Sequence, residues 1–436
     1  MQSITSPKLA LYGCRSSLRW AAFRELSTLK LASACQAAQL PSYAQRRTSI
    51  SPLRNHFGRT SPLSSIPSHT SPTVVLQQDN KAALVDDKLA EVLADFHAPV
   101  RYAVAYGSGV FQQKGYKRTD VGAKVPQHNS DANPHPDTSP RSQDAPMVDF
   151  LFGVTHPEHW HSLNIRQNRH HYSSLAFCGS RVVAQVQDKI GAGLYFNTDV
   201  EVAGVRIKYG VVSIDRLIKD LLDWETLYLA GRLHKPVKVL RDDARVSLAN
   251  RRNLRAAVRA ALLTLPQELT EEDLFLTIAG LSFRGDFRMR MGGENPHKVY
   301  NIVYSQMDEF RAIYKPIVED LPNVNYTSDN TILQDPDLRL RATAIQKLPK
   351  TLHDKIYTYY KADHPQDGTT LEEPKFSQTV AKSDKVAAYV EKSLADIVRH
   401  PAITQSLKGF LTAGLRRAVI YAWAKLKKGM KGKRKA

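Results

Sequence analysis

The chain has 436 residues, of which 42% are hydrophobic, and a formal net charge of +19 at pH 7. Residues 1–60 carry nine basic groups and the single acid Glu25, and the last twelve residues carry seven Lys and Arg and no acid. The part of the chain between these two segments therefore has a net charge of only +4. This distribution of charge argues against an extended surface that binds nucleic acid. The three cysteines are too few for a disulfide framework. No apolar run is long enough to span a bilayer.

The N-terminal segment, residues 1–78, is rich in Ser, Arg, Ala and Leu and almost free of acids. A helix over residues 18–26 would place Arg19 and Arg24 opposite its apolar side chains, which is typical of a mitochondrial presequence. We expect a disordered segment that targets the protein to the matrix and is removed before Asp79. A basic N-terminus without a targeting function is the alternative.

Folded structure is expected from Asp79, where a helical pattern leads into an apolar strand over residues 102–106. That strand ends in Gly107-Ser108-Gly109. Glycines let backbone N–H groups approach a phosphate closely, and the Ser hydroxyl adds a donor. The segment fits neither the P-loop pattern nor GxGxxG, because Gln112 occupies the position of the third glycine.

A second apolar strand, expected over residues 147–154, carries one carboxylate, Asp149. Residues 117–146 lack periodicity and predict a loop insert before it. A carboxylate on a strand beside a Gly-Ser turn can hold the Mg²⁺ that accompanies a nucleoside triphosphate, which is the arrangement of nucleotidyltransferases. Without further support, the Gly-Ser turn and Asp149 are explained better as an ordinary turn and an acid at a strand edge.

Residues 156–173 follow this strand and are dense in His, Asn, Arg and Tyr. Such side chains offer donors for phosphates and for a nucleobase. We expect His171, Tyr172 and Ser173 to contact the nucleotide. A polar surface helix is an alternative of comparable weight.

Further strands are expected over residues 193–196 and 205–212, followed by a helix that begins at Ser213. Lys208, taken to end the second of these strands, would neutralise charge on a leaving pyrophosphate. Its neighbour Tyr209 is a further candidate contact for the nucleotide. A solvated charge at a strand edge is the alternative for the lysine.

A second acid could supplement Asp149. We take Asp220, on the helix after Ser213, as the catalytic candidate, and Asp199 and Glu201 remain alternatives. Residues 285–299 combine Arg and Lys with glycines and a Glu-Asn-Pro turn, so they predict a phosphate contact at the start of a helix. A simple surface turn is the alternative there.

The chain from residue 245 onward is expected to be mainly helical, for example over residues 250–264 and 299–314. Residues 407–428 alternate apolar side chains with Lys and Arg, and a basic tail follows them. This pattern suits binding to an anionic membrane surface. A helix that packs into the core, with a solvated tail, is equally compatible.

These segments together resemble the mitochondrial translocator assembly and maintenance family, the mitochondrial phosphatidate cytidylyltransferases. The motifs that carry the resemblance spread over about 330 residues: YGSGVFQQ (106–113), MVDFLFGV (147–154), HWHSLN…QN…HYS (159–173), GAGLYFN (191–197), IKYGV (207–211), LYLAGRLHKPV (227–237) and GDFRM…GENPHKVYNIV (285–303). The resemblance implies synthesis of CDP-diacylglycerol from CTP and phosphatidic acid with Mg²⁺, for cardiolipin synthesis. It also implies a peripheral location on the matrix side of the inner mitochondrial membrane.

Carried over to this sequence, the resemblance implies that Gly107, Ser108 and Gly109 cradle the CTP phosphates, that Asp149 binds the metal and that Lys208 contacts phosphate. The chain departs from the pattern in its long insert. It also lacks the usual second acid two positions from Asp149, because Met147 and Leu151 stand there.

The expected fold class is α+β. We expect a targeting segment over residues 1–78, a nucleotidyltransferase-like mixed-sheet domain over 79–240, a helical domain over 241–403 and a membrane-binding amphipathic C-terminus over 404–436. A non-catalytic nucleotidyltransferase-like module that supports mitochondrial protein import is the alternative function.

Overall fold

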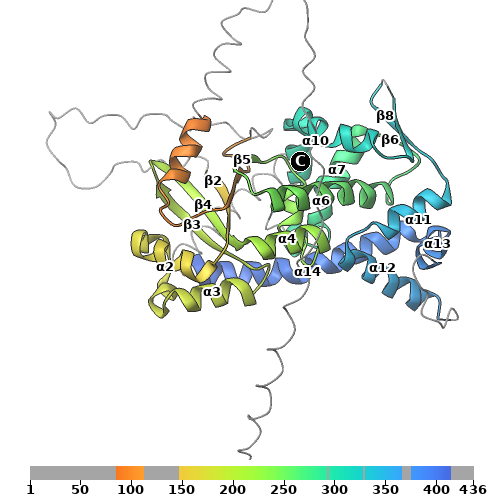
Figure 1. The fold of residues 1–436 in the computed structure, drawn as a ribbon. Helices are drawn as coiled ribbons and strands as arrows, with labels where there is room; N and C mark the ends of the chain where they lie inside the picture. The colour runs from red at the N-terminus through yellow and green to blue at the C-terminus, as the bar shows by residue number, and fades with distance from the viewer. Residues whose placement is uncertain (1–84, 112–146, 292–293, 328, 366–374, 414–436) are drawn as a thin grey trace, which may run out of the picture. The chain divides into compact units, whose positions relative to one another are not determined.

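A five-stranded mixed sheet lies in the first half of the structure, a computed structural model that describes residues 85–111, 147–291, 294–327, 329–365 and 375–413 (Figure 1). Its order is β3-β4-β2-β1-β5. Strands β2 and β4 are parallel, and the other neighbours are antiparallel. The strands are β1 (Tyr102–Tyr106), β2 (Val148–Val154), β3 (Leu194–Val202), β4 (Val205–Ser213) and β5 (Lys238–Arg241).

The two faces of this sheet pack against different parts of the chain, because successive side chains of a strand point to opposite faces. Phe150 of β2 and Tyr209 of β4 belong to a core that includes Trp160 and the helix over residues 85–94. Leu151 and Val212 belong to a second core that continues without a break into the C-terminal half. One face of the sheet therefore shares a hydrophobic core with the helical half.

Helices make up most of the rest of the chain. In chain order after the helix at 85–94 they are α2 (Pro157–Gln167), η1 (Arg169–His171), η2 (Ser174–Cys178), α3 (Ser180–Lys189), α4 (Ile214–Asp223), α5 (Ala230–Leu233), α6 (Ala244–Leu262), α7 (Glu271–Gly280), η3 (Leu281–Phe283), α8 (Phe287–Arg290), α9 (Lys298–Ser305), α10 (Met307–Glu319), α11 (Leu338–Gln346), α12 (Lys350–Asp363), α13 (Lys375–Ala381) and α14 (Val386–Ala413). The expected α+β fold is confirmed.

The elements predicted within the described residues are present, and several of them differ in extent. The strand expected over residues 193–196 continues to Val202. The helix that begins after Ser213, whose hydroxyl accepts from Arg216 N, ends at Trp224 in the left-handed region (φ +54°). The helix expected over residues 299–314 is two helices, α9 and α10, which meet at Gln306.

A small antiparallel sheet interrupts the half expected to be helical. It has the order β6-β8-β7, with β6 (Glu268–Thr270), β7 (Val324–Tyr326) and β8 (Thr331–Gln334). Strands of three or four residues are too short to show the alternating pattern by which a strand is recognised in sequence. The sequence analysis missed them for this reason.

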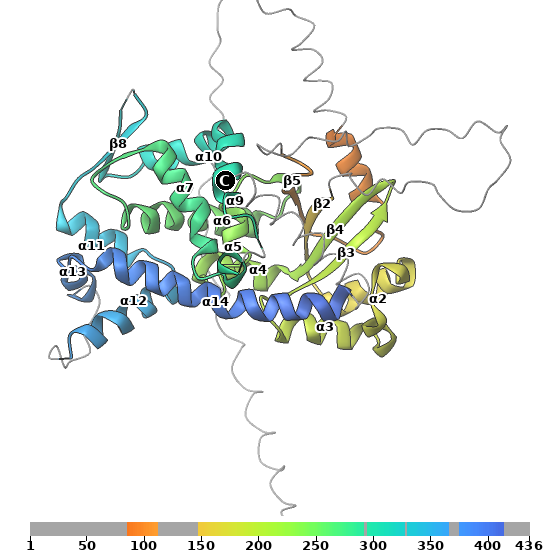
Figure 2. The same cartoon turned by 180° about the vertical axis from the view of Figure 1, so that it is seen from behind.

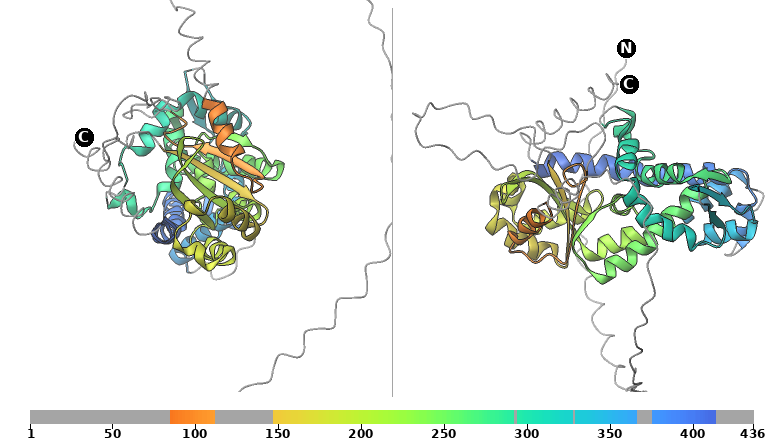
Figure 3. Two further views of the ribbon diagram at one scale, coloured as in Figure 1. Left: turned by 90° about the vertical axis from the view of Figure 1, so that its left-hand side faces the viewer. Right: turned by 90° about the horizontal axis from the view of Figure 1, so that it is seen from above.

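The long helix α14 contacts both halves of the structure. It packs on α12, η3 and α8, and farther along on β3, as the views from the front, from behind and from above agree (Figures 1, 2 and 3). The expected domain boundary between residues 403 and 404 falls inside this helix. Helix α14 is therefore part of the folded body up to Ala413.

Several sequence predictions lie outside the described residues, namely the targeting segment, the insert at 117–146 and the basic tail from residue 414. Within the described part, no helix combines the length and the hydrophobicity required to cross a membrane.

Candidate functional site

Asp149 and Lys208 lie beside each other on the sheet face that packs toward the helical half. They are register partners on β2 and β4, and Lys208 Nζ is 3.6 Å from Asp149 Oδ1. The side chains keep 27% and 16% of their surface exposed. Lys208 lies in the middle of β4 and not at its end, as the sequence analysis supposed. Solvent or a ligand can therefore reach a paired carboxylate and ammonium here.

The turn after β1 brings Gly107 onto this pair. Gly107 has φ +85°, and a Cβ there would lie 3.0 Å from Asp149 Oδ2, so a larger residue would strain the backbone and crowd the carboxylate. Gly109 packs closely on Met147 and Val148 at the start of β2, and Ser108 between them is half-buried. The predicted turn and the predicted carboxylate are thus adjacent, and phosphate binding by the turn stays a prediction.

Arg232, on α5, extends the site from the sheet to the helical half. Its guanidinium lies 4.4 Å from the centroid of the Tyr106 ring, at the end of β1. Burial would lower the pKa of Arg232, but the neighbouring Tyr106, Tyr228 and Asp149 raise it overall. Burial raises the pKa of Tyr106 to about 12, so its hydroxyl stays protonated at neutral pH.

Three more basic side chains continue from Arg232, and we call the four the cation cluster: Arg232, Lys235, Arg288 and Lys298. Lys235 Nζ and Lys298 Nζ lie 4.8 Å and 5.4 Å from the centroid of the same ring, that of Phe283. The charges of Arg288 and Lys298 act on Arg232 and Lys235, respectively.

Two carboxylates accompany the four cations. Arg288 donates to Asp286 at 2.7 Å, and Lys298 Nζ lies 3.1 Å from Glu294. Positive charge therefore exceeds negative charge in a partly desolvated place, where a phosphate would be attracted more strongly than at the surface. The cluster and the Asp149–Lys208 pair together form the candidate active site.

Asp149 fits a divalent cation only together with ligands from outside the protein. No group of three or more His, Cys, Asp or Glu within the described residues is arranged to hold a metal ion. Magnesium commonly takes one or two carboxylates and completes its octahedron with substrate phosphates and water. A partly exposed carboxylate beside phosphate-attracting cations matches that donor set.

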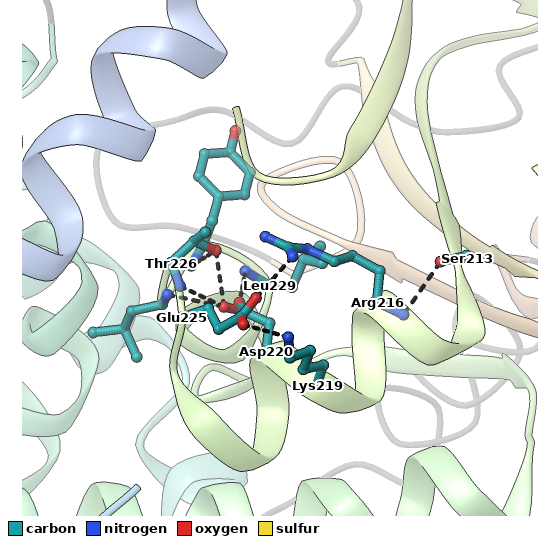
Figure 4. A network of polar contacts seen from close by, with 9 residues as sticks. Ser213, Arg216, Lys219, Asp220, Glu225, Thr226 and Leu229 are labelled. Atoms are coloured by element: carbon teal, nitrogen blue, oxygen red, sulfur yellow. Dashed lines mark hydrogen bonds and ion pairs between the residues drawn. The ribbon is translucent and has the colours of Figure 1, made fainter. Parts of the chain in front are cut away.

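Asp220, the predicted second catalytic acid, has a structural role instead. It is fully buried, and its Oδ1 accepts hydrogen bonds from Thr226 N, Thr226 Oγ1 and Leu227 N at 2.7–3.1 Å (Figure 4). Its Oδ2 accepts from Leu229 N at 2.9 Å and Ala230 N at 3.1 Å. With both oxygens occupied by donors, the carboxylate anchors the loop after α4 and has no capacity left for a metal or substrate.

Tyr209, His171 and Tyr172 are also interior residues and not an open nucleotide site. Asn164 Nδ2 donates to the hydroxyls of Tyr172 and Tyr209, each at 2.9 Å. His171 Nδ1 shares a hydrogen bond of 2.9 Å with Tyr209, and His161 Nδ1 one of 2.8 Å with Tyr172. All are buried, and Tyr209 faces away from Asp149 because it alternates with Lys208 along β4. The burial and mutual hydrogen bonds of these three side chains do not support the prediction that they bind the nucleotide.

The remaining candidates lie apart from the site. Ser173 is buried and caps η2, where its hydroxyl accepts from Leu175 N. Asp199 forms an ion pair with Arg206, and Glu201, the register partner of Arg206, is exposed near the β3–β4 turn. Neither acid is supported as a second metal ligand.

The sequence analysis found part of the cation cluster and missed the rest. The segment 285–299, predicted to contact phosphate, supplies Arg288 and Lys298. Arg232 and Lys235 were not singled out, although they lie three apart in the otherwise apolar segment 227–237. A basic side chain in a largely apolar segment is costly to bury unless it has a partner or faces a ligand. The position of Arg232 and Lys235 in this segment was therefore the sequence signal that could have identified them.

This chain is similar to known proteins over most of its length. The profile of a family described as "Phosphatidate cytidylyltransferase, mitochondrial" matches residues 89–428. Proteins of that name from Xenopus laevis, Bos taurus and Schizosaccharomyces pombe are 40%, 40% and 35% identical to this chain over 347, 345 and 356 residues. The matches cover 79%, 78% and 80% of this chain and 95%, 94% and 84% of the relatives.

Proposed function

The chain belongs to the mitochondrial phosphatidate cytidylyltransferase family, and we propose that it makes CDP-diacylglycerol and pyrophosphate from CTP and phosphatidate at the site around Asp149. The observation that carries the placement is the Asp149–Lys208 pair facing the cation cluster. Both substrates bring phosphate groups, and the reaction separates a third anion, pyrophosphate. A site with more cations than carboxylates attracts the phosphate groups of CTP, of phosphatidate and of pyrophosphate.

In the reaction, a phosphate oxygen of phosphatidate attacks the α-phosphorus of CTP. A new phosphorus–oxygen bond forms as the bond from the α-phosphorus to the bridging oxygen breaks, and pyrophosphate leaves with that electron pair. No proton has to move, because the attacking phosphate is already ionised. The protein therefore acts by positioning and by charge, as in other phosphoryl-type transfers.

Each residue has a distinct task in this scheme. Lys208, which is paired with Asp149, and Arg232, on which the charge of Asp149 acts, would draw the triphosphate toward the sheet. Arg288 and Lys298 would neutralise the phosphate groups farther from it. We propose that Asp149 holds Mg²⁺ with oxygens of the nucleotide. The ion would supply charge neutralisation at the triphosphate.

We further propose that the protein acts at the matrix side of the inner mitochondrial membrane and feeds cardiolipin synthesis. The product is a lipid, so the enzyme has to reach a bilayer. The basic, amphipathic composition of residues 407–436 supports attachment through the end of the chain. The basic N-terminal segment supports import into the matrix.

The decisive experiment follows pyrophosphate release by the purified protein with CTP, Mg²⁺ and phosphatidate vesicles. Asp149→Asn should reduce turnover by about two to three orders of magnitude, because it removes one well-placed charge at unchanged size. Asp308→Asn is the matched control, since this carboxylate is 94% exposed on α10. Turnover near the wild-type rate in a folded Asp149→Asn protein would remove Asp149 from the site, and no turnover by the wild type would overturn the activity itself.

A further inference from the structure

Lys235 is buried without an acidic partner, at the centre of the cation cluster. Only 7% of the residue is exposed. Its Nζ donates to Gly231 O at 2.7 Å and to Ser282 Oγ at 2.9 Å, and both acceptors are neutral. Within the described residues no carboxylate forms an ion pair with it. A buried lysine of this kind is the residue type whose charge state changes most readily.

The charged groups around Lys235 are cations. Arg232 lies three residues before it, and Lys298 of α9 lies close to the same Phe283 ring. The nearest acids of the cluster are engaged elsewhere, Glu294 with Lys298 and Asp286 with Arg288. The adjacent His234 is neutral, because burial lowers its pKa to about 3.

Two effects therefore oppose a charge on Lys235 in the empty protein. Burial lowers the pKa of Lys235 well below its ordinary value, and the charges of Arg232 and Lys298 lower it further. The phosphate of a bound substrate would reverse the second effect, because an anion beside Arg232 and Lys298 would outweigh their repulsion.

We propose that Lys235 is a proton-accepting member of the cation cluster, neutral in the empty enzyme and protonated when a substrate phosphate binds beside Arg232 and Lys298. The proton comes from solvent and bonds to the Nζ lone pair, while the donation to Gly231 O and Ser282 Oγ is kept. This inference rests on the proposed function, because it needs the cluster to receive phosphate. It explains how four basic side chains can lie together before substrate arrives, because only three of them are then charged.

Proton uptake has a measurable consequence for binding. When binding takes up one proton, the affinity falls tenfold for each unit that the pH rises across the range of uptake. The Lys235→Arg variant, which is always charged, should lose this dependence while it keeps a cation in the cluster. The Lys235→Met variant should lose it together with the charge.

Calorimetric titration of the full chain tests the proposal. CTP with Mg²⁺ and, in a separate arm, dihexanoyl phosphatidate are titrated at about pH 8.5, where their phosphates are ionised, in buffers that differ in ionisation enthalpy. The dependence of the heat on the buffer gives the number of protons taken up. We expect about one proton for the wild type with the probe that reaches the cluster, and none for Lys235→Arg or Lys235→Met.

Lys315→Met is the matched control, since this lysine is 42% exposed on α10 and should leave the uptake unchanged. Binding without buffer-dependent heat in the wild type overturns the proposal and leaves the proposed function intact. The same uptake in both Lys235 variants places the proton elsewhere and also overturns it. Absence of any binding by either probe overturns the proposed function, and this inference with it.

Discussion

Replacing Asp220 by Asn distinguishes an anchoring carboxylate from a catalytic one. The carboxylate accepts five hydrogen bonds, four of them from backbone N–H groups of the loop after α4. An Asn side chain has nearly the same shape but keeps only one oxygen. Its NH₂ group has to face either the N–H groups of Leu229 and Ala230 or those of Thr226 and Leu227.

The structure sets the size of the effect. At least two N–H donors lose their acceptor in either orientation, and a hydrogen bond to a charged group contributes about 1.5–3 kcal/mol. We therefore expect Asp220→Asn to lower the free energy of unfolding by about 3–6 kcal/mol, a large part of the roughly 5–15 kcal/mol typical of a domain. The reaction itself should be almost unaffected per folded molecule.

Urea unfolding followed by circular dichroism measures the first quantity, and pyrophosphate release per folded molecule measures the second. Asp223→Asn is the control, because this half-buried acid lies on the same helix and should change the free energy of unfolding by less than about 0.5 kcal/mol. An Asp220→Asn protein that unfolds like the wild type but has lost its activity would refute the anchoring role and restore Asp220 to the reaction.

Two other predictions follow from the helix α14 and from the buried histidines. A chain that ends after residue 413 should keep its thermal midpoint of unfolding but no longer float with cardiolipin liposomes. A chain that ends after residue 403 should also have a lower midpoint, because the contacts of Gln405 and Lys408 with the segment that leads into β3 are lost. Equal midpoints for the two truncated chains would contradict this packing. Burial lowers the pKa of His161 to about 4. The contribution of the neutral imidazole to stability is therefore present above pH 6.5 and is lost as the pH falls from 6.5 toward 4. The loss is up to about 1.4 kcal/mol per pH unit. Urea unfolding between pH 7.5 and 5 should show a smaller loss for His161→Gln than for the wild type, and an unchanged pH dependence would count against this residue.

The sequence was sufficient to predict the strands that carry the candidate site and to single out two of its residues. Apolar runs located β1 and β2, and Asp149 was the single acid within the second run. The loop glycine Gly107 was predictable for the same reason, since its turn requires left-handed backbone. These inferences depend on local pattern alone.

The sequence was not sufficient to separate polar residues that face a ligand from those that satisfy one another in the interior. Asp220 and Tyr209 have the residue types expected of a nucleotide site, yet their partners come from the backbone of a later loop and from α2. The amphipathic pattern of residues 407–428 likewise placed Leu407 among the apolar side chains and Lys408 among the basic ones, without showing which side packs inward. In the structure Leu407 is 64% exposed and Lys408 is buried.

Lys408 shows why the reversal is possible. Its Nζ donates to the carbonyls of Val186, Gln187 and Ile190 at the end of α3, where the unpaired carbonyls of a helix favour a cation. Burial nevertheless lowers its pKa to about 7, against the opposing effect of Asp188. A lysine can therefore be the docking residue of a helix, and its apolar neighbour can be left in solvent.

The docking of α14 also determines how the two parts of the site are spaced. Asp149 and Lys208 belong to the sheet, whereas Arg288 belongs to α8, which follows η3. Gly285, in the turn between η3 and α8, lies so close to Ala395 of α14 that any Cβ there would overlap the helix backbone. Farther along the same helix, Gln405 accepts a hydrogen bond from Ala192 N and donates one to Leu194 O at the start of β3. One helix thus contacts both the turn before α8, which carries Arg288, and the start of β3, which belongs to the sheet of Asp149, so the spacing between Arg288 and the carboxylate is supported by a segment outside the candidate site.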